Sequence, residues 1–221
     1  MGILRSFFED SKLALAFYLS GSNGNVWSGG DVPVPTGDWV TRVTDTVQGY
    51  LTDAEMEHNA PFVWAYFRTN LQWNVNSVAA LLGNMQGEST LNPGLIEVGG
   101  GTTSAGPGGG LVQWTPRNDL YKVLDRLYGK HDDWYDGNKQ LAVIFAEYQE
   151  ASGEAHRGIE KQWYATNSYP LSFKQWAFNE LNYSVEQLTY AFASNYLRPA
   201  VVQQPERVKN ALKWLAFFNK G

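Results

Sequence analysis

The chain has 221 residues, a formal net charge of −5 and 43% hydrophobic residues, which is enough for one sizeable buried core. It has no cysteine, so thiol nucleophiles and disulfides are excluded. The 17 lysines and arginines are dispersed along the chain, whereas nucleic-acid binding needs a clustered basic face, so no nucleic-acid partner is expected. The three histidines follow no ligand pattern, and neither a metal nor another cofactor is expected.

Residues 1–37 are expected to form an N-terminal arm. The apolar run Leu13–Leu19 is shorter than the roughly 20 apolar residues of a membrane span, so no stable membrane span is expected. A signal peptide is the weaker alternative, because the positively charged start is a single Arg5 and no clear cleavage site follows the run. A segment rich in Gly, Ser, Asn and Pro follows and indicates a linker. We therefore expect a docking helix and arm over residues 1–37 and one domain over residues 38–221.

Helical patterns dominate the chain after residue 50. The preceding segment, 39–50, alternates Val and Thr and is interpreted as a strand or an extended connection. Thr52 and Glu55 have the spacing of a capping box and predict a helix start. Further helices are expected at residues 61–70, 75–88, 117–128, 138–150, 172–181, 184–197 and 205–219. This pattern predicts a mainly α-helical fold.

Glu88 is the strongest candidate for a catalytic residue. The helix expected from Val75, with Asn76 or Ser77 as its N-cap, carries an apolar stripe and places Glu88 in its last turn. A carboxylate there lies against the negative end of the helix dipole and near buried neighbours, and both effects raise its pKa. A raised pKa suits a general acid.

The segment 98–110 contains too much glycine for a helix and is expected to be a hairpin or loop beside a cleft. No Gly-Lys-Ser/Thr sequence closes the run, so a phosphate-binding loop is not favoured. Glycines without side chains would let a bulky ligand approach the backbone. Gln113 and Trp114, which follow the run, would then line the cleft.

Two motifs carry a family resemblance by their order and spacing. The first is Glu88-Ser89 followed by Asn92-Pro93, and the second is the run from Gly110 to Gln113, Gly-Leu-Val-Gln. Together they resemble the lysozyme and lytic-transglycosylase superfamily, and within it the bacteriophage tail lysozymes. Later segments that begin at Gln140, Ser184, Tyr196 and Arg207 extend the resemblance from about Asn59 to about Phe218.

The resemblance implies an α+β lysozyme-like fold, with a helical bundle lobe and a small glycine-rich β-hairpin beside the active-site cleft. It implies that Glu88 protonates the leaving oxygen of a glycosidic bond, and that Ser89, Gly110, Gln113 and Trp114 contact the substrate. A second carboxylate often assists this reaction. Glu97 is the first candidate and Asp119 a weaker one, although a solvated surface role is favoured for both. Glu147 could border the cleft, but it lies beside an apolar helical stripe that favours a structural role.

The expected function is cleavage of the glycan strand of bacterial peptidoglycan by a virion component at a phage tail tip, during DNA delivery into a Gram-positive host. Other tail proteins are expected to bind the arm of residues 1–37. A lytic transglycosylase, an endolysin and a catalytically inert tail plug or wall-binding component with the same fold are the alternatives. The sequence does not distinguish hydrolysis from transglycosylation, nor does it identify the linkage cut.

Overall fold

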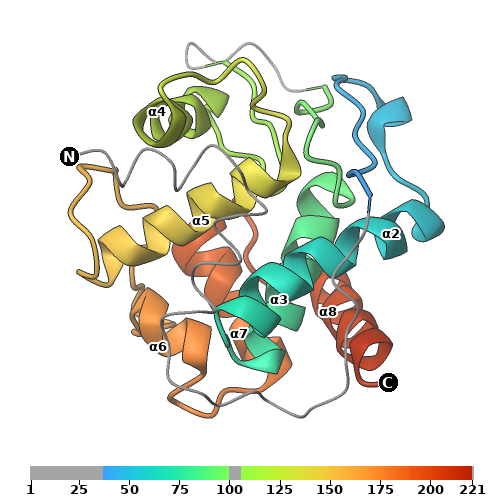
Figure 1. The fold of residues 1–221 in the computed structure, drawn as a ribbon. Helices are drawn as coiled ribbons and strands as arrows, with labels where there is room; N and C mark the ends of the chain where they lie inside the picture. The colour runs from blue at the N-terminus through green and yellow to red at the C-terminus, as the bar shows by residue number, and fades with distance from the viewer. Residues whose placement is uncertain (1–36, 100–105, 221) are drawn as a thin grey trace.

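The computed structural model describes residues 37–99 and 106–220. The predicted arm therefore lies outside the described residues except for Gly37, as does the middle of the glycine-rich segment. Seven α-helices occur in the described ranges and confirm the mainly helical prediction (Figure 1). They are α2 (Asp53–Trp64), α3 (Val75–Ser89), α4 (Arg117–Tyr128), α5 (Gly137–Ala151), α6 (Phe173–Phe178), α7 (Val185–Phe192) and α8 (Pro205–Phe218).

Several helix boundaries differ from the sequence prediction. The N-cap of α3 is Asn74, whose side chain accepts a hydrogen bond from the backbone N–H of Asn76, so the prediction of Asn76 or Ser77 was wrong. Ser77 is instead buried and donates to the carbonyl of Trp176 at 2.7 Å. The helices expected at Thr52 and at residue 61 are one continuous unit, because α2 runs directly into the π-helical segment η2 (Ala65–Asn70). A second π-helical segment, η3 (Ala193–Leu197), extends α7 in the same way.

Helix α3 is the central element of the fold. It packs against α8 along most of its length and against α7, and it carries ten buried residues (Figure 1). Gly83 makes the close approach of α8 possible, since a Cβ atom there would lie 2.5 Å from the carbonyl oxygen of Arg207 and 2.6 Å from the backbone nitrogen of Ala211. The glycine thus places the start of α8 beside the C-terminal half of α3, where Glu88 lies.

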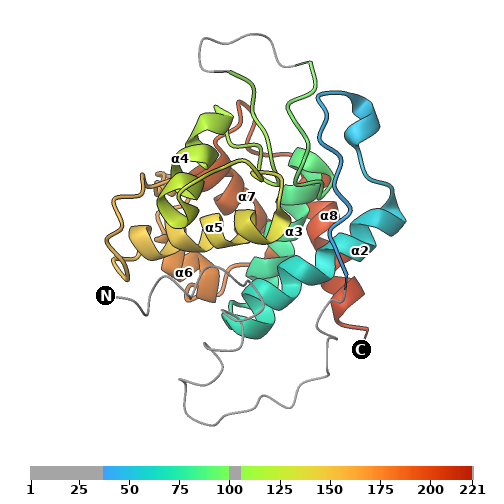
Figure 2. The ribbon, with the colours of Figure 1, turned by 45° about the horizontal axis from the view of Figure 1, so that its top comes forward.

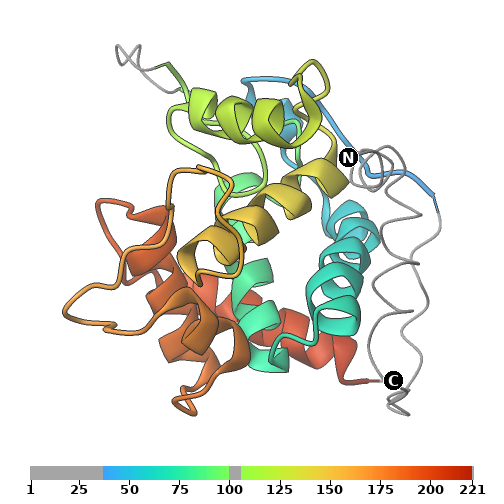
Figure 3. The same ribbon diagram turned by 60° about the vertical axis from the view of Figure 1, so that its left-hand side comes forward.

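Aromatic side chains fill the core on the side of α6 and α7. Trp163 stacks on Phe173 at a centroid distance of 4.6 Å, and Phe192 stacks on Tyr196 at 4.6 Å. The indole of Trp176 is fully buried and donates to the carbonyl of Leu188 at 2.8 Å. On the opposite side α4 and α5 pack together, one above the other in Figure 3. Trp64, Trp176 and Trp214 are all buried, in agreement with the structural role predicted for them.

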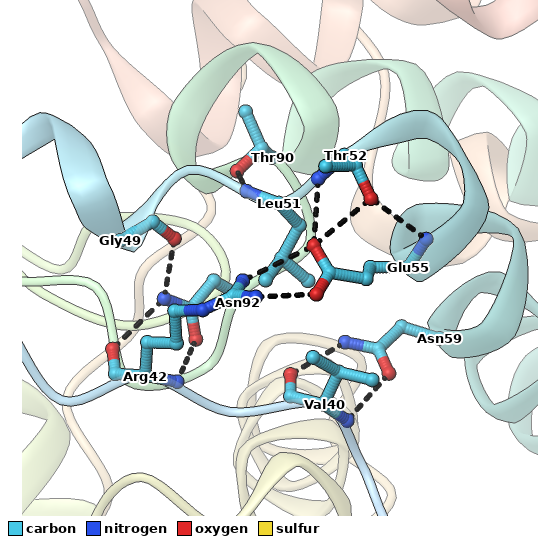
Figure 4. A network of polar contacts seen from close by, with 9 residues as sticks. All are labelled: Val40, Arg42, Gly49, Leu51, Thr52, Glu55, Asn59, Thr90 and Asn92. Carbon is cyan, nitrogen blue, oxygen red and sulfur yellow. Dashed lines mark hydrogen bonds and ion pairs between the residues drawn. The ribbon is translucent and has the colours of Figure 1, made fainter.

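The segment 38–50, which ends in the 3-10 helix η1 (Val47–Gly49), lies beside the segment that follows α3 (Figure 2), and Thr44 forms a parallel bridge with Leu95. Two buried amides fix this arrangement (Figure 4). Asn59 bonds to the backbone N–H and carbonyl of Val40, and Asn92 bonds to both backbone groups of Arg42 and to the carbonyl of Gly49. Because buried amides seldom remain unpaired, the asparagine of the Asn-Pro motif is a structural clamp here.

The described residues do not contain the expected β-hairpin. Within residues 95–99 and 106–114 the structure contains only isolated antiparallel bridges, between Ile96 and Gly109 and between Gly109 and Trp114. Glycine is disfavoured in strands, so a glycine-rich segment that forms single bridges instead of continuous strands is expected. Among the described helices none has the length and hydropathy needed to cross a membrane.

Candidate active site

Glu88 lies in the last turn of α3, as predicted. The helix ends at Thr90, which has a left-handed backbone with φ 51°, and Leu91 follows with φ 60°. Two successive non-glycine residues in this region are unusual, and such strain often accompanies functional sites. The turn is held by Thr90, whose hydroxyl accepts from the N–H of Leu51 at 2.8 Å. The end of α3 is therefore fixed relative to the extended segment.

The carboxylate of Glu88 is paired with Arg207 of α8. Arg207 Nη2 donates to Glu88 Oε1 at 2.6 Å, and the side chains are 6% and 17% exposed for Arg207 and Glu88 respectively. The aliphatic part of Arg207 packs over Gly87, where a Cβ atom would lie 3.1 Å from its Cγ. Arg207 Nη1 also donates to the carbonyl of Asn84 at 3.3 Å. The guanidinium is thus held in one position and leaves Glu88 partly accessible.

Opposing effects act on the protonation of Glu88. Burial is the largest and raises the pKa of the carboxyl above its ordinary value, while the charge of Arg207 and its hydrogen bond lower it. The negative charge of Glu97 raises the pKa further. The net direction is upward, so the carboxyl retains its proton to higher pH than a solvated glutamate. Such a group, with 17% of its side chain exposed, can deliver a proton to a bound ligand.

Glu97 is held on the glycine-rich segment. Its Oε2 accepts from the backbone N–H of Gly108 at 2.9 Å, and its own N–H donates to the Gly108 carbonyl at 3.0 Å. A Cβ atom on Gly108 would lie 2.4 Å from the hydroxyl of Thr115, so the close approach requires glycine. The structure therefore brings the second predicted carboxylate into the electrostatic range of Glu88. Asp119, the weaker candidate, forms an exposed ion pair with Lys122 at 2.7 Å.

Ser89 and Gly110 connect α3 to the second motif. Ser89 is 1% exposed, and its hydroxyl donates to the carbonyls of Met85 at 3.1 Å and Leu111 at 2.9 Å. Gly110 has φ 83°, and a Cβ atom there would lie 2.8 Å from the amide oxygen of Gln140. Both residues are close-packed within the protein. Their contacts set the position of the loop with respect to Glu88.

Gln113 and Trp114 have their polar groups turned towards the protein. Gln113 Nε2 donates to the carbonyls of Leu95 and Gly110, both at 3.0 Å. Trp114 is 2% exposed, and its indole nitrogen donates to Glu147 at 3.3 Å. Both nevertheless line a pocket of about 280 Å³, whose other walls are Val112, Thr115, Gln162, Tyr196, Leu197 and Arg198.

Glu147 of α5 lies behind this pocket. It is 3% exposed and accepts hydrogen bonds from Trp114 and from the hydroxyl of Tyr196. Burial raises its pKa to about 8, although these two hydrogen bonds oppose the shift. The buried position agrees with the structural reading of Glu147. Its two partners, however, are pocket-lining residues, so it also fixes the pocket wall.

Sequence reasoning assigned no part in the site to Arg207 or Gln140. Gln140 is fully buried, accepts from the N–H of Leu111 at 2.8 Å and donates to the carbonyls of Pro93 and Trp134 at 2.8 and 2.7 Å. Arg207 could have been found from its spacing, because it shares the buried stripe of α8 with Ala211 and Trp214. An arginine in an apolar stripe requires a buried partner. Among the described residues no group of three or more His, Asp or Glu side chains is placed to hold a metal ion.

The chain is similar to known phage proteins over the part that contains both motifs. The profile of a family described as phage tail lysozyme matches residues 58–218. Morphogenesis protein 1 of Bacillus phage B103 is 35% identical over 166 residues, which cover 75% of this chain and 40% of that relative. The chain thus spans well under half the length of this relative. From the extent of the profile match and the identity to the relative, the chain belongs to the phage tail lysozyme family.

Proposed function

We propose that this protein cleaves the glycan strand of peptidoglycan, with Glu88 as the proton donor. The observation that carries the proposal is the raised pKa of a partly exposed carboxyl at the end of α3, in a chain of the phage tail lysozyme family. Cleavage of a glycosidic bond requires a proton on the leaving oxygen, and a glutamic acid whose pKa is raised by burial is suited to supply it.

We assign Glu97 as the second carboxylate. Its hydrogen bond from Gly108 orients the group, and its charge acts on Glu88. In this role Glu97 stabilises the positive charge that develops at the anomeric carbon or orients the attacking water. The same negative charge keeps the proton on Glu88 until it is transferred. The two groups therefore divide acid and charge-stabilising functions between them.

The remaining predicted residues support the site in different ways. Ser89 and Gly110 are packed inside the protein, which favours a role in positioning the loop. Residues 112–115 and Tyr196 line the pocket and are the proposed contacts of the sugar.

The family name and the name of the phage relative support a place in the virion. We propose that the protein is a tail component that opens the cell wall locally during DNA delivery, and that residues 1–37 bind other tail proteins. The relative comes from a Bacillus phage, which is consistent with a Gram-positive wall as substrate.

Mass spectrometry of the soluble fragments released from purified Gram-positive peptidoglycan tests this function. Hydrolysis gives fragments with a free reducing end, and the sugar at that end identifies the linkage. Fragments lighter by one water would show that an internal hydroxyl attacks and that the enzyme is a transglycosylase. No release from walls of several compositions would contradict the proposed activity and favour an inert tail component.

A further inference from the structure

A second pocket adjoins the proposed sugar site. It has a volume of about 450 Å³ and lies between α4 and the segment 158–164. Gln162 and Arg198 line both this pocket and the pocket beside Trp114. The two hollows are therefore neighbours on one surface, with Arg198 between them.

The second pocket is cationic although the whole chain carries a net charge of −5. Four basic side chains line it, namely Lys122, Arg126, Lys161 and Arg198. Two exposed or half-exposed carboxylates, Asp119 and Glu160, face them. Glu147, which also lines this pocket, has its pKa raised to about 8 by burial and adds little negative charge at neutral pH. An excess of positive charge in a concave site attracts anionic ligands.

Three of these cations have donor atoms available to a ligand. Lys122 is paired with Asp119 at 2.7 Å, whereas Arg126 uses only Nε, which donates to the carbonyl of Arg157 at 2.6 Å. Lys161 is exposed and forms no ion pair with any described residue. Arg198 uses Nη1 for backbone carbonyls, and its Nε and Nη2 have no hydrogen-bond partner among the described residues.

Arg198 is also held in place before any ligand binds. It follows η3 with a left-handed backbone, φ 54°, and its guanidinium lies over the ring of Tyr164 at 5.2 Å. Its Nη1 donates to the carbonyls of Gln162 and Asn195. A fixed guanidinium loses little freedom on binding and presents a planar pair of donors that suits a carboxylate.

We propose that this second pocket binds the acidic peptide stem of the substrate through Lys161 and Arg198. The inference rests on the proposed glycan cleavage and deepens it. The stem branches sideways from the lactyl group of a muramic acid residue, so it needs a site beside the sugar pocket. The cationic pocket lies beside the pocket at Trp114, and its free N–H donors suit the carboxylates of the stem. The preferred substrate is then a peptide-bearing glycan.

Binding of three matched oligosaccharides to the full chain carrying Glu88→Gln tests the proposal, because that substitution prevents turnover. One oligosaccharide carries the peptide stems, one has had the peptides removed, and one carries stems with amidated carboxylates. Calorimetry should show that the oligosaccharide with unmodified stems binds roughly tenfold more tightly than the other two. A factor of this size corresponds to about one charge-assisted hydrogen bond. The preference should disappear at high salt.

Single substitutions test which residues cause the preference for the acidic stem. Lys161→Gln should reduce the preference for the acidic stem while leaving binding of the peptide-free strand unchanged. Arg198→Gln should also reduce the preference, together with some loss of binding for all three oligosaccharides, because Arg198 lines both pockets. Lys209→Gln, a control on α8 whose side chain is 75% exposed, should keep the preference. Equal affinity for all three oligosaccharides, or an equal loss for all three in the Lys161 variant, would overturn the stem site. The proposed function fails separately, if the unsubstituted chain leaves every oligosaccharide intact.

Discussion

Arg207 donates a hydrogen bond of 2.6 Å to Glu88 from a position 119 residues later in the chain. The pair joins the start of α8 to the end of α3, and Gly83 and Gly87 provide the close packing that it needs. Arg207 orients the carboxyl, yet burial outweighs its charge, so the pKa of Glu88 stays above the ordinary value. The ion pair with Arg207 thus orients the Glu88 carboxyl, while the pKa of that carboxyl remains raised.

Arg207→Met should move the alkaline limit of activity to higher pH. The charge and hydrogen bond of Arg207 now lower the pKa of Glu88, so their loss leaves burial and Glu97 to raise it further. Since the protonated form is the active one, kcat/KM should persist to higher pH. Methionine retains much of the buried volume. Lys209→Met on the exposed face of α8 is the control and should leave the profile unchanged. A downward shift in the Arg207 variant would contradict this account.

Glu147 should make the folded state less stable as the pH rises. Its folded pKa is raised from 4.5 to about 8, so its stabilising contribution is complete below pH 4.5 and is lost as the pH rises towards 8. Glu147→Gln cannot ionise, and its thermal unfolding midpoint should fall less over this range. The loss in free energy of unfolding over this pH range should differ between the two proteins by the order of a few kcal/mol. Glu186→Gln, at an exposed position of α7, should follow the unsubstituted chain. Parallel curves for all three proteins would contradict the assignment.

Gln140→Ala should loosen the loop that carries Gly110. Three backbone groups, of Leu111, Pro93 and Trp134, would lose their buried partner. Each unsatisfied group costs about 1–3 kcal/mol, although water can enter part of the space. We expect a loss of at least about 2 kcal/mol in urea unfolding. Asn118→Ala, an exposed amide on α4, should change stability by less than about 0.5 kcal/mol. Similar stabilities for the two variants would show that Gln140 does not hold the loop.

Gly83→Ala should separate α3 from α8. The added methyl group would overlap the backbone of Arg207 and Ala211, which no rotamer can relieve. Overpacking of this kind costs about 1–3 kcal/mol or more, and the shift should also weaken the ion pair to Glu88 and reduce activity. Leu212→Ala on the 50% exposed side of α8 is the matched control. An unfolding midpoint equal to that of the control would contradict the tight interface.

The helices and Glu88 could be predicted because their signals are local. Apolar spacing predicts α3, and α4 begins and ends at the residues expected. The choice of N-cap for α3 could not be predicted, since Asn74, Asn76 and Ser77 are all suitable and a contact with Trp176 engages Ser77. The expected hairpin depended on glycine content, which allows many backbones and specifies none.

The partners of the site residues required the fold. Arg207 and Gln140 reach Glu88 and the Gly110 loop from helices far away in sequence. Trp114 shows the same limit, because its position after a glycine-rich run suggested an open cleft residue, whereas Glu147 of α5 draws its indole into the core. Long-range pairings of this kind leave no local pattern in the sequence.

The rate of reducing-end release from purified peptidoglycan by Glu88→Gln, compared with Glu57→Gln, tests the central claim most directly. Glutamine can still accept the hydrogen bond from Arg207, so the fold should be retained, which circular dichroism would verify. Loss of a general acid lowers the rate by about 100-fold or more. The exposed Glu57 of α2 should be replaceable without effect. A folded Glu88→Gln protein that releases fragments as fast as the Glu57 control would contradict the role of Glu88.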